Sequence, residues 1–496
     1  MTRIIIAALV FFSWLAFQPA AAAQDPQKDQ DWATEEDPWG ETESGEEDPW
    51  GEEAEEEDPW GEEEEPSAAA PWEEDATEEK SAFSFSGRFW TRLAHDLREQ
   101  NPYEDDAYNH TKLRLRADYD PAPGTSLVMS IDGDHFIYRN SGDHDHTTSI
   151  RPYEFYIRRS WDWLEITLGN QIVRWGKIDQ VSPLDIVNPE DLRDGFAQTR
   201  EERKLPIPMV DLKLFKGMYK FEAVFIPFFQ ESKLDLIGRD WAMFHHYDRQ
   251  VGPFEIVEKD LPNDLSHSEY GFRFSGTFKK LDYALSYFRT REDTPSIGTI
   301  AAPPGFRVPD PSRATLMGLA RTANDLSQPV TLDYKRQHVY GLEFETTWGE
   351  FGIRGDFAYI HERYFLDHRL RRTSRPVFHY ALGVDYNRPG SYYVNIQFSQ
   401  QIVRHYESTL LFADEVTNAV NGTLTKDLWD GKLELGLRYL YNFTQDDYYL
   451  NPSVTLEYWR NITLELGLDI LGGPEESTLG VFEDNDEAYC IFEYHF

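Results

Sequence analysis

The chain has 496 residues, a formal net charge of −41, 15% aromatic residues and one cysteine. The negative charge argues against a nucleic-acid partner. A lone Cys490 excludes a disulfide framework, a Cys-ligated zinc site and a Cys-x-x-Cys-His haem attachment. Many aromatic residues in a polar chain without a long interior apolar run are typical of short alternating strands, not of membrane-spanning helices.

The N-terminus has the pattern of an export signal. A positive start, Met1-Thr2-Arg3, precedes an apolar core over residues 4–17 and an Ala-rich end over residues 18–23. This order predicts a secretory signal peptide over residues 1–23, cleaved near Ala23. No cysteine follows the cleavage region, so a lipoprotein is not expected.

Residues 24–82 form an acidic segment with repeats. Residues 35–79 hold 23 acids and no Lys or Arg, and Asp-Pro-Trp-Gly recurs at positions 37, 48 and 58 before a degenerate Pro71-Trp72. Self-repulsion, proline and glycine predict a disordered periplasmic tail. Two interpretations stay open: a solvated spacer, or docking motifs for a basic periplasmic partner. The docking residues would be Trp39, Trp50, Trp60 and Trp72.

From Phe83 to the C-terminus the chain alternates between strand patterns and turns. Short turns, such as those at 121–124, 216–218 and 460–461, alternate with longer connections at 139–149, 175–205, 231–266, 291–335, 363–374, 405–414 and 473–484. Apolar residues recur with a period of two, as in 391–402, 432–441 and 461–470. We therefore predict an all-β fold, a transmembrane antiparallel β-barrel of about 18 strands (16 are possible) over residues 83–496.

The last strand supports an outer-membrane location. Phe492, Tyr494 and Phe496 alternate with Glu493 and His495, which resembles the C-terminal signature of bacterial outer-membrane barrels. This resemblance implies a closing strand that serves as the assembly signal for the barrel-assembly machinery. On the same outward parity, Cys490 is interpreted as a small apolar residue facing outer-membrane lipid.

If the apolar faces point to lipid, their polar partners line a lumen. Basic residues collect in the early strands and acidic residues in the later ones, which predicts a transverse field across the lumen. The alternative is that a water-filled lumen tolerates any charge and that the segregation is chance. The predicted lumen charges are Lys112, Arg114, Arg116, Arg158, Arg273, Arg354, Glu343, Glu345, Glu465 and Asp469.

The longest charged connection is a candidate constriction. Asn188 could cap a short helix that starts at Pro189, with Asp191 bonding back. We predict that residues 176–205 fold into the lumen, although an ordered surface loop is the alternative. The predicted pore residues are Arg174, Trp175, Lys177, Glu190, Asp191, Arg193, Asp194, Arg200 and Arg203.

The same region resembles a known family. Gln171 followed by Trp175-Gly176, then Asn188-Pro189-Glu190-Asp191, then Leu205-Pro206-Ile207-Pro208-Met209, is similar to the outer-membrane barrels of the domain of unknown function 1302 family. Some members are encoded near inner-membrane transporters of the resistance–nodulation–division type. The resemblance implies a transport or envelope role and adds an inner-membrane transporter as a possible partner of the acidic tail.

The other clusters predict little chemistry. Asp143-His144-Asp145-His146 could bind a metal, but we interpret it as part of a solvated loop, and His245-His246 is a weaker candidate. No catalytic constellation stands out, so neither an enzyme, a cofactor nor a metal site is expected. The predicted function is an outer-membrane channel or transport component for small polar or amphipathic solutes. The alternatives are a plugged, non-conducting scaffold and a sheath around a haem protein.

Overall fold

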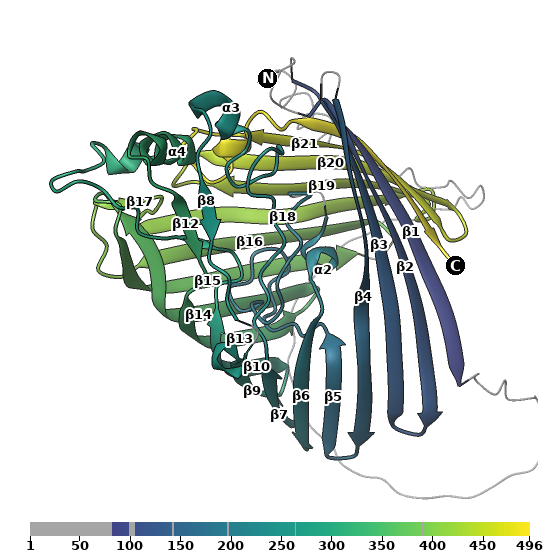
Figure 1. Cartoon of the computed structure of the whole chain (residues 1–496). Helices are drawn as coiled ribbons and strands as arrows, with labels where there is room; N and C mark the ends of the chain where they lie inside the picture. The colour runs from purple at the N-terminus through teal and green to yellow at the C-terminus, as the bar shows by residue number, and fades with distance from the viewer. Residues whose placement is uncertain (1–81, 99–104, 141–142, 196–197, 263, 389) are drawn as a thin grey trace, which may run out of the picture. The chain divides into compact units, whose positions relative to one another are not determined.

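A computed structural model describes residues 82–98, 105–140, 143–195, 198–262, 264–388 and 390–496 (Figure 1). The predicted signal peptide, nearly all of the predicted acidic tail and its four docking tryptophans lie outside these residues. The helices and strands therefore belong to the predicted barrel alone.

Eighteen antiparallel strands form a closed barrel, as the sequence predicts. Each strand pairs with the next barrel strand in the chain, and the last pairs with the first. The strands are β1 (Phe83–Asp96), β2 (Ala107–Ala122), β3 (Thr125–Asn140), β4 (Asp143–Trp161), β5 (Leu164–Gln171), β6 (Ile207–Lys216), β7 (Tyr219–Ile226), β9 (Glu269–Phe278), β10 (Leu281–Arg291), β13 (Arg336–Trp348), β14 (Phe351–Asp367), β15 (Arg372–Arg388), β16 (Tyr392–Val403), β18 (Val416–Leu428), β19 (Leu433–Asn442), β20 (Asp447–Trp459), β21 (Ile462–Gly472) and β22 (Glu487–His495).

The seam between β1 and β22 is closed by the C-terminal residue. Gly87 and Phe496 exchange two backbone hydrogen bonds, of 2.8 and 3.0 Å. A Cβ at Gly87 would lie 2.1 Å from the ring of Phe496. The ring can therefore occupy this position only when residue 87 is glycine. Phe492 packs edge-on against Phe89 of β1 at 6.2 Å between ring centroids. Closure removes the exposed strand edges that an open sheet would present.

The period of two separates an outer apolar face from an inner polar one. On β16, Ile396 is 50% exposed, whereas its neighbours Asn395 and Gln397 are buried. Trp163 and Trp348 are largely exposed beside the short turns that follow β4 and β13. In a closed barrel this outward apolar face fits the hydrocarbon of a membrane, and tryptophans at strand ends fit its interface. No helix among the described residues is long and apolar enough to cross a membrane.

The short turns at one end of the barrel lie where the sequence predicts them. Some of the longer connections at the other end do not. The predicted loop 139–149 is wrong, because β3 continues to Asn140, β4 begins at Asp143, and the two strands pair over the described residues of this stretch. The predicted connection 363–374 is also mostly strand, since β14 ends at Asp367 and β15 begins at Arg372. Both extensions prolong a ladder of backbone hydrogen bonds. They were not predicted, because apolar and polar residues stop alternating in these stretches.

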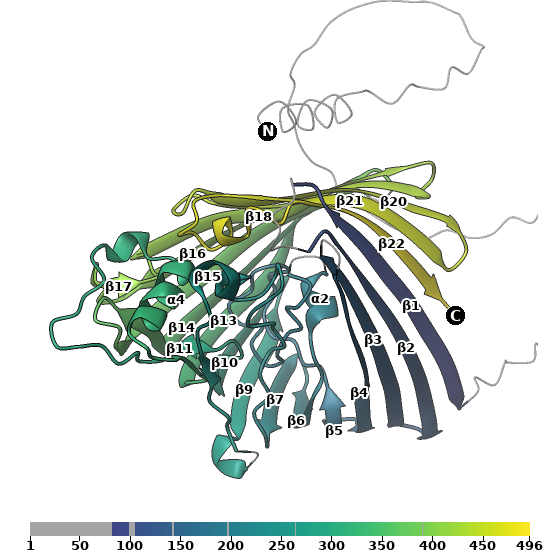
Figure 2. The same ribbon diagram turned by 45° about the horizontal axis from the view of Figure 1, so that its top comes forward.

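The long-loop end has its own apolar core. Connections 227–268 and 292–335 contribute β8 (Ile256–Glu258), β11 (Ser296–Ile297) and β12 (Val330–Asp333), which form a small sheet, and the helices α3 (Tyr247–Val251) and α4 (Leu316–Asp325). The other short elements in the long connections are three 3₁₀ turns (Leu265–His267, Pro311–Arg313, Gly480–Phe482) and β17 (Leu410–Leu411), and Leu411 of β17 belongs to this core. Buried Phe244, Leu319, Leu332 and Leu370 pack together there. Figure 2 shows α4 beside β17 at this end.

The barrel wall is uneven in height. β4 has 19 residues, whereas β5 and β7 have 8 each and β6 and β9 have 10 each. Each of these strands has one end at a short turn on the same side of the barrel. The wall is therefore low from β5 to β9 and tall at β1–β4 (Figure 1). The connections 172–206 and 227–268 start from this low rim.

Candidate lumen site

Residues 172–206, here called the lumen segment, connect β5 to β6 and bridge the inside of the barrel. Towards β13 and β14, Gly176 N donates to Glu343 at 2.8 Å, and Lys177 N, Ile178 N and Ser182 Oγ donate to Asp356 at 2.6–3.0 Å. Glu343 and Asp356 are buried on the inner wall.

Contacts of the same segment reach the opposite strands. Asp194 lies 2.6 Å from His110 Nδ1 of β2, and Glu202 pairs with Arg88 of β1 at 2.7 Å. Since β1–β2 and β13–β14 are about half a turn apart in the ring of strands, the segment spans the lumen.

An apolar anchor fixes the start of the lumen segment. Trp175 is 2% exposed, packs edge-on against Phe288 at 5.6 Å, and donates its indole N–H to Glu222 at 3.2 Å. It belongs to a cluster with inward-facing residues of β6 and β7, among them Ile207 and Val224. Trp175 is therefore an anchor and not a pore-facing residue. The inner wall is apolar here, which the assignment of every apolar face to lipid did not predict.

A buried polar clamp closes the base of the lumen segment. The Asn188 side chain accepts from Val173 N at 2.8 Å and donates to Gln171 O and Leu205 O at 3.0 and 2.8 Å. Lys204, 1% exposed, donates to the backbone oxygens of Asp185 and Asn188. The predicted helix at Asn188 is wrong, because this side chain bonds across the base of the segment and does not cap a helix.

A short helix forms later in the segment. α2 covers Arg200–Arg203 and begins after Thr199, where a reciprocal capping box joins Thr199 and Glu202. The sequence signal for this turn is Thr199 followed three residues later by Glu202, and this helix was not predicted. Figure 1 shows α2 above the end of β5.

The charged residues of the lumen segment pair mainly with one another. Arg200 and Arg203 both contact Glu190, at 3.0 and 3.2 Å, and Arg193 pairs with Asp191 at 2.7 Å. Arg174 pairs with Glu201, and Lys177 reaches Glu345 of β13 at 2.8 Å. The segment is thus an ion-paired body, and Lys177, Asp194 and Glu202 link it to the wall.

Two carboxylates of the lumen segment stay ionised inside the barrel. Burial alone would raise the pKa of Asp194, but His110, Lys112 and Arg92 outweigh burial and lower this pKa to about 2. Burial likewise opposes ionisation of Glu190, whose pKa is lowered by Lys204, Arg200 and Arg203. Asp194 therefore contributes as an anion to docking of the segment on the wall, and Glu190 contributes to the ion pairs within the segment.

The wall charges are paired locally. On the early strands, Arg114 pairs with Asp132 at 2.7 Å, Arg116 with Glu154 at 2.6 Å and Arg158 with Glu165 at 3.9 Å, and Lys112 donates to Gln198. Farther along, Arg273 pairs with Glu343 and Arg354 with Asp385 at 2.7 Å, Asp469 pairs with Arg92 at 2.5 Å, and Glu465 accepts from Tyr489. The predicted segregation is incomplete, because inward carboxylates on the early strands, such as Asp132 and Glu154, neutralise their basic neighbours.

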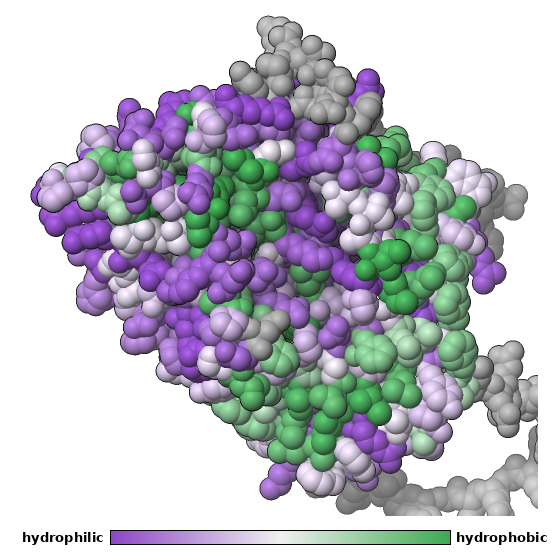
Figure 3. Space-filling model, viewed as in Figure 1, coloured by the Kyte–Doolittle hydropathy of each residue, from purple (hydrophilic) through white to green (hydrophobic). Residues whose placement is uncertain are grey.

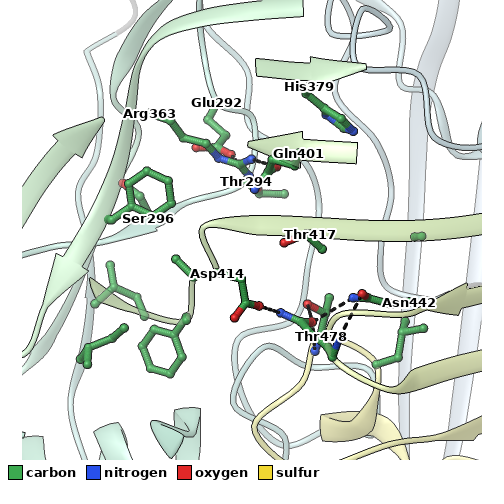
Figure 4. A pocket seen from close by; sticks show the side chains of 18 of the residues that line it. Glu292, Thr294, Ser296, Arg363, His379, Gln401, Asp414, Thr417, Asn442 and Thr478 are labelled. Atoms are coloured by element: carbon green, nitrogen blue, oxygen red, sulfur yellow. Dashed lines mark hydrogen bonds and ion pairs between the residues drawn. The ribbon is translucent and has the colours of Figure 1, made fainter. Parts of the chain in front are cut away.

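A cavity of about 600 Å³ with polar and apolar walls lies between the lumen segment and the long-loop end. Val181 of the segment lines it together with residues from β14–β16, β18 and β19 (Figure 4). Arg363 bridges Gln401 at 2.6 Å and Glu292 at 3.1 Å. Leu316 and Phe412 add apolar surface. The cavity could hold a small molecule with both polar and apolar parts.

A second cluster joins two connections at the long-loop end. Ligand atoms of Asp105, Asp240 and His246 lie within 4.8 Å of one another. Asp105 N–H donates to Asp240 at 3.2 Å, and His246 Nε2 lies 3.0 Å from the Asp240 carboxylate. The sequence analysis did not predict this cluster. The Asp143–His146 stretch, interpreted there as a loop, belongs to β4, and Asp145 pairs with Arg239.

A closed 18-stranded barrel with an apolar outer face and a segment across its lumen is a membrane-spanning β-barrel of the outer-membrane class. The chain belongs to the family described as Protein of unknown function (DUF1302), whose profile matches residues 73–370. This confirms the resemblance seen around residues 171–209.

Solved structures resemble the barrel at low sequence identity. OccAB4 of Acinetobacter baumannii is 9% identical, covers 84% of this chain and 99% of its own, and has a TM-score of 0.48. OccD3 (OpdP) of Pseudomonas aeruginosa is 9% identical over 84% and 91%, with a TM-score of 0.46. The outer membrane channel DcaP of Acinetobacter baumannii is 8% identical over 84% and 97%, with a TM-score of 0.38. No curated protein matches the chain.

Proposed function

We propose that this protein is an outer-membrane channel for small polar or amphipathic solutes, and that the lumen segment restricts its pore. The observation that carries the proposal is the span of this segment, from Arg88 and His110 on one wall to Glu343 and Asp356 on the other. A solute that crosses the barrel has to pass this ion-paired segment. The proposal assigns no catalytic role to any residue.

The long-loop end would face outward. In barrels of this class the short turns lie in the periplasm and the longer loops lie outside the cell. The N-terminal tail would then begin on the periplasmic side, where its tryptophans could recruit a partner such as an inner-membrane transporter. Capture of that partner by the tail, lost when Trp39, Trp50, Trp60 and Trp72 are replaced by Ala, would test this part.

The rival function is a plugged scaffold. It is favoured by the apolar cluster around Trp175 and Ile207, which fills part of the lumen where a channel would hold water. In this case the segment seals the barrel, and the loops and tail serve only for interaction with other proteins.

Single-channel conductance separates the two functions. We would compare refolded wild type with a deletion of residues 178–203 in a planar bilayer. Steady wild-type conductance that grows on deletion supports a restricted channel. A silent wild type that opens only on deletion supports a plug, and silence in both proteins, once folding is verified, refutes the channel.

A further inference from the structure

The barrel wall has a notch beside β4. β4 pairs with β3 from Asp143 to Arg159, but with β5 only from Phe155 to Trp161. Among the described residues, the part of β4 above Phe155 therefore has no ladder on its β5 side. Pro152 lies in this stretch, beside a register shift in the pairing of β4 with β3, and proline, which has no N–H, is tolerated at edges and bulges. Figure 1 shows β5 ending far below the top of β4.

The notch reaches into the apolar belt. Register places Asn170, near the end of β5, opposite Phe155, whose side chain is 54% exposed. Higher on β4, Ile150 is 78% exposed, and on β3 Ile131 is 53% exposed. At about 3.3 Å per residue, Ile150 lies roughly 16 Å along the strand beyond Phe155. Lipid-facing side chains on β3 and β4 thus continue above the level at which β5 ends.

A charged cavity of about 830 Å³ lies behind the notch. Its walls are the unpaired part of β4, Asn170, the end of the lumen segment near Pro206, and connection 227–268. The space-filling view in Figure 3 shows apolar side chains over the lower part of this face and hydrophilic residues above them. An entrance here would join the lipid-facing surface to the side of the lumen segment.

The cavity offers donors to an anion. Arg151 is 19% exposed, and its Nε and Nη1 atoms are buried without a hydrogen-bond partner in the described chain. The third nitrogen, Nη2, lies 3.4 Å from Asp134 and 3.8 Å from Asp191. The guanidinium is therefore incompletely satisfied. Lys233 lines the same cavity. The acids Glu231, Glu258 and Asp260 also line it, and Glu258 accepts from Tyr334.

We propose that this notch is a lateral portal for anionic amphiphiles. The carboxylate or phosphate head would bind Arg151 and Lys233 inside the cavity, and the apolar tail would lie along Ile150 and Phe155 in the membrane. An unsatisfied buried guanidinium binds an anionic oxygen group strongly because both groups regain the hydrogen bonds lost on desolvation. The inference rests on the proposed channel function and names a substrate class for it.

Binding of a fluorescent C16 carboxylate tests the portal. We would titrate this probe into wild type in phosphatidylcholine vesicles, and compare Arg151→Gln, Lys233→Gln and Arg159→Gln. Arg159→Gln is the matched control, because this substitution also removes one positive charge from β4. Arg159 lies near the short-turn end, where it donates to Thr125. We expect saturable wild-type binding, about tenfold weaker in each cavity variant and unchanged in the control, because one charge-assisted hydrogen bond is worth about 1.5 kcal/mol or more.

Two further readouts keep the outcomes distinct. Competition by phosphatidylglycerol in the same vesicles would identify the bilayer as the source of the ligand. A lack of competition would identify a free amphiphile as the ligand. Either result supports the anionic site. Lys233→Gln keeps the test decisive if Arg151→Gln does not fold. No saturable binding, or equal binding in all variants, overturns the portal. Conductance measured in parallel shows whether the channel fails as well.

Discussion

Asp356→Ala should release the tip of the lumen segment. The Asp356 carboxylate is fully buried and accepts hydrogen bonds from Lys177 N at 2.9 Å, Ile178 N at 3.0 Å and Ser182 Oγ at 2.6 Å. Hydrogen bonds to a charged group are worth about 1.5–3 kcal/mol each. Their loss, partly offset because a buried charge is removed as well, should weaken docking by about 3–4 kcal/mol.

This magnitude predicts a large change in gating. Since 1.4 kcal/mol is a factor of about ten, the released state should become roughly a hundred times more populated or more. Planar-bilayer recordings of the refolded variant should therefore show frequent openings to a larger conductance than wild type. Anchors at Glu343 and Trp175 remain, so release should be local and transient.

Asp211→Ala is the matched control. It also removes a buried inner-wall carboxylate, but the ion pair of Asp211 is with Lys213 of its own strand at 3.1 Å. Its conductance should keep the wild-type gating pattern. Heat-modifiable migration verifies folding of both variants. A folded Asp356→Ala barrel with wild-type conductance would refute the restriction by residues 176–182.

Three other perturbations test separate parts of the structure. Trp175→Ala should cost about 3–5 kcal/mol of packing and make the lumen segment at least tenfold more sensitive to limited proteolysis, with barrel melting little changed; equal proteolysis would exclude the anchor. Gly87→Ala should lower the melting temperature of the refolded barrel, because the new Cβ meets the Phe496 ring at 2.1 Å, and Gly87→Ala with Phe496→Ala should recover part of this loss. Asp194 has a lowered pKa, so its contribution to docking is complete above its usual pKa of 3.8 and is lost as pH falls towards about 2. Conductance should be steady from about pH 5 to 8 and rise below about pH 4, and Asp194→Asn should flatten this acid response; a wild-type rise at neutral pH would contradict the assignment.

Some local features of the site were visible in the sequence, and others were not. The charged character of residues 174–203 and the family pattern around Trp175 and Asn188 identified the right segment. The role of Asn188 was missed, because its partners Gln171, Val173 and Leu205 meet only when both ends of the segment come together. Asp356 could not be found either, since 178 positions separate it from Ile178.

Local patterns in the sequence are enough to predict the barrel. Alternation, turn spacing and the closing Phe496 predict about 18 strands and their lipid-facing sides, because each of these patterns depends on neighbours within a few residues. The filling of the lumen depends instead on contacts between residues that are far apart in the chain. Ile207 and Val224 share their strand parity with the charged residues Asp211 and Glu222, and they pack against Trp175, so that the inner wall is apolar there. The low rim at β5–β7 and the cavity beside Arg151 arise from strand register between distant segments, which a local pattern does not encode.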